Sequence, residues 1–435
     1  MAEFTKEMKK QGYTILGPDM APIHFRLIKN LFAEYGYRLE LLSGNSRSCV
    51  DEGLKYVHND TCYPALLVIG QMMEALHSGK YDLDRTALIL TQTGGGCRAS
   101  NYIHLLRKAL EKDGLERIPV ISLNTAGLEK NSGFKIKLSM LRKGLATLIY
   151  GDLLMLLVNQ TRPYERVKGA SDALVDKWVA ALNSLFLKRR GYSERAQKKI
   201  LPRIAADFAA VELEKTPKVK VGIVGEIFVK YSPLGNNELE KFLFEQNCET
   251  MIPGIVAFFL ASVDHQIDDV GLYGGNKAKR AVFRILMKYL CKAEKNMLDA
   301  AAACGKFIVP SPYYEMKEHA RGLIGFGCKM GEGWLLTAEM NELIELGYDN
   351  IVCIQPFGCL PNHIVGKGMI RKLKNLYPDS NIVPVDYDPG ATKVNQENRI
   401  KLMLSVAAEK LRGEPDSAEE EEILAEAAAT EADNG

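Results

Sequence analysis

The chain has no long hydrophobic run and almost no net charge. Its 435 residues contain no stretch of about 20 uninterrupted apolar residues, which is the length that spans a bilayer. The first segment, MAEFTKEMKKQGY, lacks the apolar centre of a signal peptide. The formal net charge of +2 gives no electrostatic attraction to nucleic acid. We therefore expect a cytoplasmic protein that binds neither membranes nor nucleic acid.

Two kinds of motif are also missing. No GxxxxGK[ST] loop is present, so we do not expect this chain to hydrolyse ATP by itself. The nine cysteines include no CxxC pair and no CxxxCxxC run, which argues against a zinc ribbon or a ferredoxin-type site. An odd number of dispersed cysteines in a long chain favours free thiols or metal ligands over a disulfide framework.

The length and the apolar content predict more than one domain. With 47% hydrophobic residues the chain can form a large core, and 435 residues exceed what one core usually holds. Strand-like segments YTILG, YRLELL, ALILTQ and PVISLN alternate with helical segments, which is typical of a parallel α/β sheet. A second series of this kind begins at KVKVGIVGEIF. We therefore predict an α/β fold with two Rossmann-like parallel-sheet domains.

The predicted boundaries follow from these patterns. Residues 1–160 form the first α/β domain, 161–217 a helical connector with few β-branched runs, and 218–412 the second α/β domain. Residues 413–435 are acidic and rich in alanine, without an apolar face large enough to offset the entropy of ordering, so we predict a disordered tail.

Three cysteines share a local pattern in which a turn places the cysteine at the start of a helix. The segments are HNDTCYP (Cys62), TQTGGGCRASNY (Cys97) and IQPFGCLPNHI (Cys359). Before Cys97 the run TALILTQ predicts a buried strand, and IVCIQ does so before Cys359. Around Cys62, the polar residues HNDT supply candidate helix caps, and Pro64 fits a first helical turn.

A thiolate is favoured at a helix N-terminus because the unpaired N–H groups carry partial positive charge. Ligands in open parallel sheets bind at the carboxyl ends of strands. We therefore expect Cys62 and Cys97 from the first domain to meet Cys359 from the second in the cleft between the domains, as an iron-sulfur site with an open fourth position. The alternative is that each is a small buried hydrophobic residue, which is our interpretation of the other six cysteines.

Five further residues are candidates for this cleft. Gly95 and Gly96, with Gly94 before them, allow the backbone to approach a bound group. Glu226 follows a predicted strand and either faces the cleft or is an ordinary loop carboxylate. Glu332, in GEGW, is either a buried group for proton transfer or a helix cap. His363, in the first turn after Cys359, either bonds to the cluster or substrate or caps its helix.

The segments CYPALLVIGQ, TGGGCRASNY, GEGW and QPFGCLPNHIVGKGMIRKLK resemble the 2-hydroxyacyl-CoA dehydratase family. Subunits of this family also resemble benzoyl-CoA reductase subunits and double-cubane cluster proteins. The resemblance extends from about Tyr13 to Leu411 and is greatest to the dehydratase-like region of long proteins with a fused activator ATPase. It implies that Cys62, Cys97 and Cys359 ligate a 4Fe-4S cluster whose fourth iron is left for substrate or water.

The resemblance also implies an activity and partners. An activator ATPase would pass a low-potential electron to the cluster, and a 2-hydroxyacyl-CoA thioester would lose water through a ketyl radical to give the enoyl-CoA. From the local sequence described above, we expect Glu332 to be the catalytic residue and Gly95, Gly96, Glu226 and His363 to contact the substrate. An oxygen-poor host would suit such a site.

This chain departs from the family pattern in two respects. Dehydratases act as two unlike subunits, and the activator of the long relatives is missing here, so we expect a separate activator ATPase and a homodimer or a heterodimer with a related subunit. Two alternatives remain open: a double-cubane-like reductase of small molecules, with about twice the iron, or an accessory subunit that carries a cluster without catalysis.

Overall fold

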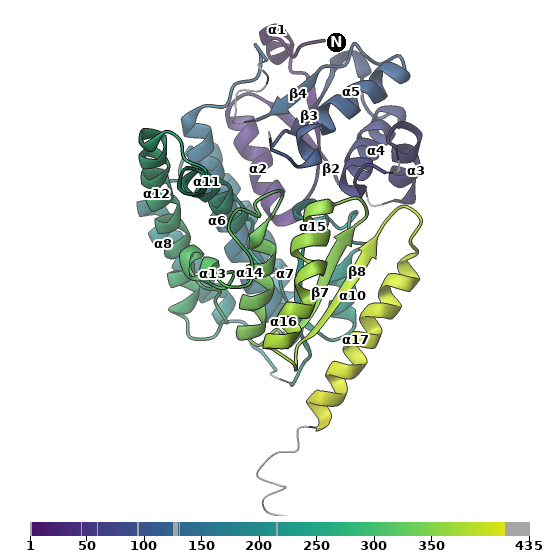
Figure 1. Cartoon of the computed structure of the whole chain (residues 1–435). Coiled ribbons are helices and arrows are strands. Elements are labelled where there is room, and N and C mark those ends of the chain that lie inside the picture. Colours follow the sequence, from purple (N-terminus) through teal and green to yellow (C-terminus); the bar gives the residue numbers. More distant parts are fainter. Residues whose placement is uncertain are drawn as a thin grey trace, which may run out of the picture.

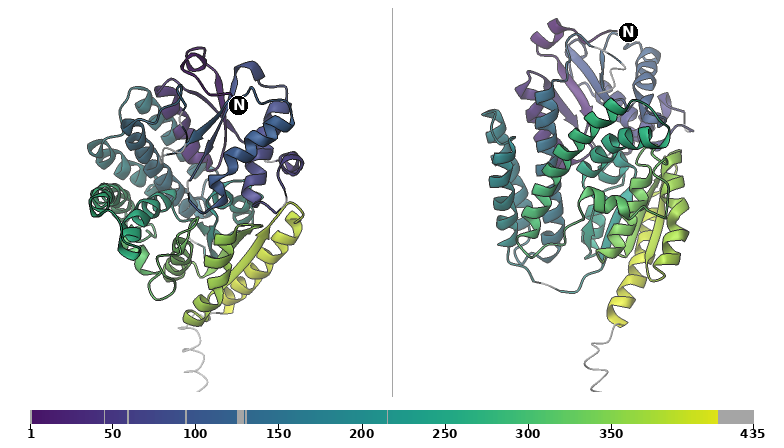
Figure 2. Two further views of the ribbon diagram at one scale, coloured as in Figure 1. Left: turned by 45° about the horizontal axis from the view of Figure 1, so that its top comes forward. Right: turned by 60° about the vertical axis from the view of Figure 1, so that its left-hand side comes forward.

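The structure is a computed structural model that describes residues 2–44, 46–58, 60–93, 95–124, 129, 131–214 and 216–413. Within these residues the chain forms two four-stranded sheets, and every strand pair is parallel (Figure 1). Helices surround both sheets, as the two additional views show (Figure 2). The predicted α/β class with two Rossmann-like parallel sheets is therefore confirmed.

The first sheet has the strand order β2-β1-β3-β4. Its strands are β1 (Thr14–Pro18), β2 (Arg38–Leu42), β3 (Thr86–Thr91) and β4 (Val120–Leu123). The main helices between them are α2 (Pro22–Glu34), α3 (Arg47–Tyr56), α4 (Tyr63–His77) and α5 (Tyr102–Lys112), and α1 (Lys6–Lys10) precedes the sheet. The four strands agree with the segments that the sequence predicts to within one residue, since β1 continues to Pro18, one residue past YTILG. Central strand β3 is almost entirely buried, which explains its continuous apolar run.

The second sheet repeats this order as β6-β5-β7-β8. Its strands are β5 (Lys220–Gly225), β6 (Glu249–Met251), β7 (Asn350–Pro356) and β8 (Asn381–Tyr387). The longer helices between them are α11 (Ile255–Leu272), α12 (Lys277–Ala302) and α14 (Trp334–Glu345); the shorter ones are α9 (Ile227–Tyr231), α10 (Leu239–Glu245), α13 (Tyr313–Glu318), α15 (Leu360–Val365) and α16 (Ile370–Leu376). Helix α17 (Lys393–Gly413) packs along edge strand β8.

Helices α6 (Leu138–Thr161), α7 (Ala170–Leu187) and α8 (Glu194–Ala209) separate the two sheets in sequence. The second half of α6 is mostly apolar and is buried on all sides, because it packs against α2 and also against α8, α12 and β6. The apolar packing is shared between the sheets: Ile15 and Val224 belong to one hydrophobic cluster, and Leu16 and Ile223 to another.

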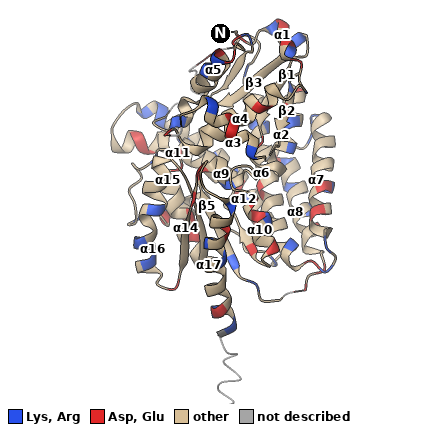
Figure 3. Cartoon of the chain, turned by 90° about the vertical axis from the view of Figure 1, so that its right-hand side faces the viewer, with Lys and Arg blue, Asp and Glu red and all other residues tan. Residues whose placement is uncertain are grey.

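The distribution of charged residues and the lengths of the apolar helices agree with the low net charge and the lack of long hydrophobic runs in the sequence. Basic and acidic residues are interspersed over the helices seen in Figure 3. In the part of the chain that the structure describes, no helix combines the length and the apolar character that a membrane crossing needs.

Two sequence expectations are corrected. The spacing of HIVGKGMIRKLKNLYP predicts one helix, but α15 ends at Val365 and α16 begins at Ile370, because Gly366 and Gly368 weaken the helix between them. The apolar run MIPGIVAFF is expected to continue the second α/β series as a strand, but only Met251 belongs to a strand (β6), and from Ile255 the run is helical. The predicted tail from 414 onward lies outside the described residues.

Candidate functional site

The carboxyl edges of the two sheets meet at a shared set of loops. The amide of Tyr63, at the start of α4, donates a hydrogen bond of 2.9 Å to the carbonyl of Phe357 in the loop after β7. The loops are so close that a Cβ on Gly358 would lie 2.2 Å from the Thr61 carbonyl oxygen, and one on Gly96 would lie 2.6 Å from the Met330 sulfur. Loops from four places in the sequence therefore form one site.

Cys62 is the N-cap residue of α4 and is buried. The expectation that HNDT supplies the cap is therefore wrong, because the cysteine itself takes that position. Its Sγ lies 2.8 Å from the Tyr102 hydroxyl. The loop before it is fixed by Arg98, whose guanidinium donates to the Asp60 carbonyl at 2.5 Å.

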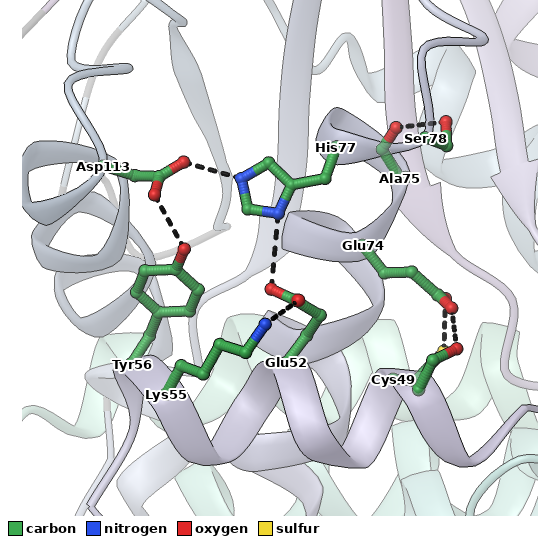
Figure 4. Close-up of polar contacts among 10 residues, drawn as sticks. Cys49, Glu52, Lys55, Tyr56, Glu74, Ala75, His77, Ser78 and Asp113 are labelled. Carbon is green, nitrogen blue, oxygen red and sulfur yellow. Dashed lines mark hydrogen bonds and ion pairs between the residues drawn. The ribbon is translucent and has the colours of Figure 1, made fainter.

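Helix α4 is held in place by its close packing on α3 (Figure 4). A Cβ on Gly70 would lie 1.9 Å from the Cys49 carbonyl oxygen, so the two helix backbones touch. Further along, the Cys49 thiol donates to Glu74 at 2.7 Å, and His77 bridges Glu52 and Asp113. These contacts fix α4 and therefore the position of Cys62 at its end. They also give Cys49 a structural role.

Cys97 and Cys359 occupy equivalent positions in the two sheets. Cys97 follows β3 and is the N-cap of the short 3-10 helix Arg98–Ser100 that leads into α5. Cys359 follows β7 and is the N-cap of α15. Strands β3 and β7 are the third strands of their sheets and pair with the first strands β1 and β5. At this place, where the strand order reverses, open α/β sheets bind ligands. The predicted strand-turn-helix setting of both cysteines is confirmed.

Cys62 is near enough to Cys97 and to Cys359 to affect the pKa of each. Burial raises the pKa of Cys97 to about 11, and the neighbouring Glu332, Glu226 and Cys62 contribute to the increase. Burial also raises the pKa of Cys359, again with Glu226, Glu332 and Cys62 adding to the effect. The pKa of Cys62 is raised by burial, against the lowering effect of Tyr102 and the Ala65 amide. Without a cation, all three are thiols at neutral pH.

Glu226 and Glu332 join the cysteines. Glu226 follows β5 and is the N-cap of α9, accepting a hydrogen bond of 2.9 Å from the Val229 amide. Glu332 is buried and accepts from the Ile227 amide at 2.7 Å. Glu332 does not cap the helix that follows it, because Gly333 is the N-cap of α14, so that alternative is wrong. The burial expected for Glu332 is confirmed.

Burial and the nearby Glu332 raise the pKa of Glu226 to about 8, and burial raises the pKa of Glu332 as well. Because the two carboxyl groups are coupled, they titrate as a pair. The pair therefore holds a proton at neutral pH.

A buried ion pair lies behind these carboxyl groups, and sequence analysis did not find it. Lys230 on α9 and Glu339 on α14 are both nearly inaccessible, and the Lys230 Nζ lies 3.1 Å from each Glu339 carboxylate oxygen. The positive charge of Lys230 partly opposes the effect of burial, which raises the pKa of Glu226 and of Glu332. The only available sequence signal was that Lys230 lies four residues after Glu226.

The remaining candidates, Gly95, Gly96 and His363, lie in the same loops or helices as the cysteines. Gly96 packs on Met330, whereas Gly95 is exposed and accepts a hydrogen bond from the Ser100 hydroxyl at its carbonyl (2.8 Å). His363 is half-buried in α15, and its imidazole has no hydrogen-bond or ion-pair partner among the described residues. Gly94 lies outside them.

The other six cysteines lie elsewhere in the fold, in helices, a strand or loops: Cys49 in α3, Cys248 before β6, Cys291 in α12, Cys304 after α12, Cys328 in an exposed loop and Cys353 in β7.

The chemistry of the three cysteines fits an iron-sulfur cluster, which takes thiolate ligands. Across the described ranges, no three His, Cys, Asp or Glu side chains are grouped so that they could hold one metal ion. In a cubane each thiolate binds its own iron, so the ligands are spaced farther apart than ligands that share an ion. Cys62, Cys97 and Cys359 are three soft sulfur donors, each at a helix N-cap, which is the ligand type that such a cluster takes.

The sequence was also compared with known proteins. Neither the scan against protein-family models nor the search of curated proteins finds a match to this chain.

Proposed function

We propose that this chain is an iron-sulfur subunit of the 2-hydroxyacyl-CoA dehydratase type, which removes water from a CoA thioester after a separate activator ATPase supplies an electron. The observation that carries the proposal is that Cys62, Cys97 and Cys359 are each a helix N-cap in a set of loops where both sheets end. The resemblance of the four sequence segments supplies the substrate class and the partner.

A bound 4Fe-4S cluster would supply one-electron reduction and a Lewis-acidic fourth iron. Its thiolates would come from Cys62, Cys97 and Cys359, and the N-terminal amides of α4 and α15 would stabilise negative charge around it.

The chain's own acid-base groups are Glu226 and Glu332. Their shared proton at neutral pH makes them suited to protonate a departing hydroxide and then to accept the β-proton of the substrate. We assign Glu332 as the catalytic group because it is the more buried of the two. Gly96, Glu226 and His363 would contact the substrate from the adjacent loops.

The test is turnover of 2-hydroxyacyl-CoA thioesters by protein purified without oxygen, in the presence of ATP, a reductant and an activator ATPase of this type. The enoyl-CoA product is identified by mass spectrometry. We expect Glu332→Gln to lower kcat at least about 100-fold with little change in KM.

Glu342→Gln is the matched control, because Glu342 is also a buried glutamate of this region, with its pKa raised by burial to about 7, and it accepts from the Ser311 amide instead of from α9. It should retain the wild-type kcat. If no 2-hydroxyacyl-CoA loses water, or if Glu332→Gln turns over like the wild type, the proposal is wrong.

A further inference from the structure

Tyr102 contacts the proposed cluster site through its hydroxyl group. The residue is buried and is the first residue of α5, five positions after Cys97. Its Oη lies 2.8 Å from Sγ of Cys62, which belongs to a different helix and a different loop. The segment that carries one proposed ligand therefore also places a hydrogen-bonding group on a second one.

The direction of this hydrogen bond is determined by the state of the sulfur. In the free thiol, either atom can donate. A sulfur bound to iron has no proton, so only the phenol can donate. A phenol, with an ordinary pKa of about 10, keeps its proton at neutral pH and can therefore act as this donor.

A hydrogen bond to a ligand sulfur acts on the redox state of a cluster. Reduction adds negative charge that is shared with the sulfur atoms, and a donor at the sulfur stabilises that charge. The reduction potential is therefore higher with the donor than without it. Groups of this kind also orient the ligand that they contact.

We propose that Tyr102 is a positioning residue that donates a hydrogen bond to the Cys62 thiolate and thereby raises the reduction potential of the bound cluster. The inference rests on the proposed function, because it requires that Cys62 ligates the cluster. It goes further by naming the residue that adjusts the potential at which the activator must deliver an electron.

The experiment measures the midpoint potential of the cluster by an EPR-monitored redox titration. It compares the wild type with Tyr102→Phe, which removes only the hydroxyl. Tyr150→Phe is the matched control, since Tyr150 is also buried but its hydroxyl donates to the Gly191 carbonyl at 2.8 Å. In a fourth protein, 3-fluorotyrosine replaces Tyr102, which makes the phenol more acidic and a stronger donor.

We expect a more negative potential for Tyr102→Phe, a more positive one for the 3-fluorotyrosine protein, and no change for Tyr150→Phe. Proton ENDOR of the reduced cluster should show an exchangeable proton that Tyr102→Phe lacks. Iron content should be equal in all four proteins.

A Tyr102→Phe protein with full iron and an unchanged potential would overturn the inference and leave the proposed function intact. If Tyr102→Phe lost its iron, the 3-fluorotyrosine protein would decide, because it keeps the hydroxyl; an unchanged potential there overturns the inference. An iron-free wild type would overturn both proposals.

Discussion

At the scale of single residues, turn chemistry identified the three cysteines but not their neighbours. Each cysteine follows a local pattern of strand or polar turn, glycine or proline, and helix, so its place at a helix start could be predicted. Tyr102 and Lys230 carry no such pattern. Their partners, Cys62 and Glu339, are 40 and 109 positions away, and only the folded chain brings them together.

Gly358 shows how closely the loops of the two sheets approach. Its φ of +72° favours glycine, and a Cβ there would also collide with the Thr61 carbonyl. We predict that Gly358→Ala costs about 1–2 kcal/mol for the left-handed backbone and a further 1–3 kcal/mol, roughly, for the overlap. Separation of the loops would also abolish iron binding.

The matched control for this change is Gly347→Ala. Gly347 has a φ of +83° but open space where the Cβ would be, so the variant has the backbone cost alone. Thermal unfolding and iron content of the two variants give the comparison. Equal unfolding temperatures and equal iron would show that the contact at Thr61 is unimportant.

At the scale of secondary structure elements, two short connections fix the carboxyl groups. Glu332, just before α14, accepts from the first amide of α9, and Glu339 inside α14 pairs with Lys230 inside α9. The sequence indicated a helix after GEGW, which is α14, but α9 has only five residues and no periodicity that could be recognised. Long amphipathic or buried elements are predictable, whereas a single turn defined by tertiary contacts is not.

The ion pair between α9 and α14 predicts a non-additive pair of mutations. Lys230→Met leaves the Glu339 carboxyl buried without a partner and should destabilise the protein by about 3–5 kcal/mol. Adding Glu339→Met removes that group, so the double variant should recover most of the loss. Urea unfolding measures both.

Lys295→Met on α12 is the control, because Lys295 forms an exposed pair with Asp299 at 2.8 Å; its effect should stay within about 1 kcal/mol. A double variant that is no more stable than Lys230→Met would contradict the role assigned to the pair.

At the scale of the whole molecule, the two sheets share one strand order, and this repetition explains the site. Cys97 and Cys359 follow the third strands, and Glu226 follows the first strand of the second sheet. The presence of two parallel sheets could be predicted from alternating strand and helix patterns. That their carboxyl edges face a shared site was expected from the cysteines at the strand ends. The packing of α6 against both halves, which holds the sheets in this orientation, could not be predicted because it depends on contacts far apart in the sequence.

The buried acids predict how the stability of the whole chain depends on pH. Burial raises the pKa of Glu294 from its ordinary 4.5 to about 8. The folded state then binds this proton more tightly than the unfolded chain does, so the stability it contributes is complete below about pH 4.5 and is lost as the pH rises through 8.

Glu294→Gln keeps an oxygen that can accept from the Tyr313 amide and removes the titration. Relative to the wild type, we expect it to gain a few kcal/mol between pH 5 and 9, because a pKa difference of one between the folded and unfolded chain corresponds to about 1.4 kcal/mol. Thermal unfolding at pH 5 and at pH 9 measures the difference in stability between the variant and the wild type, and the surface variant Glu245→Gln is the control. A difference from the wild type that is the same at both pH values would contradict the assignment.

The central claim is that cysteines from both sheets hold one cluster. The most direct measurement is iron and sulfide content after purification without oxygen, for the wild type, for Cys62→Ser, Cys97→Ser and Cys359→Ser, and for Cys304→Ser as a control outside the site. We predict about four irons per chain in the wild type and in Cys304→Ser, and loss of iron in each of the other three. Absence of iron from the wild type, or iron that is indifferent to these three cysteines, would contradict the account.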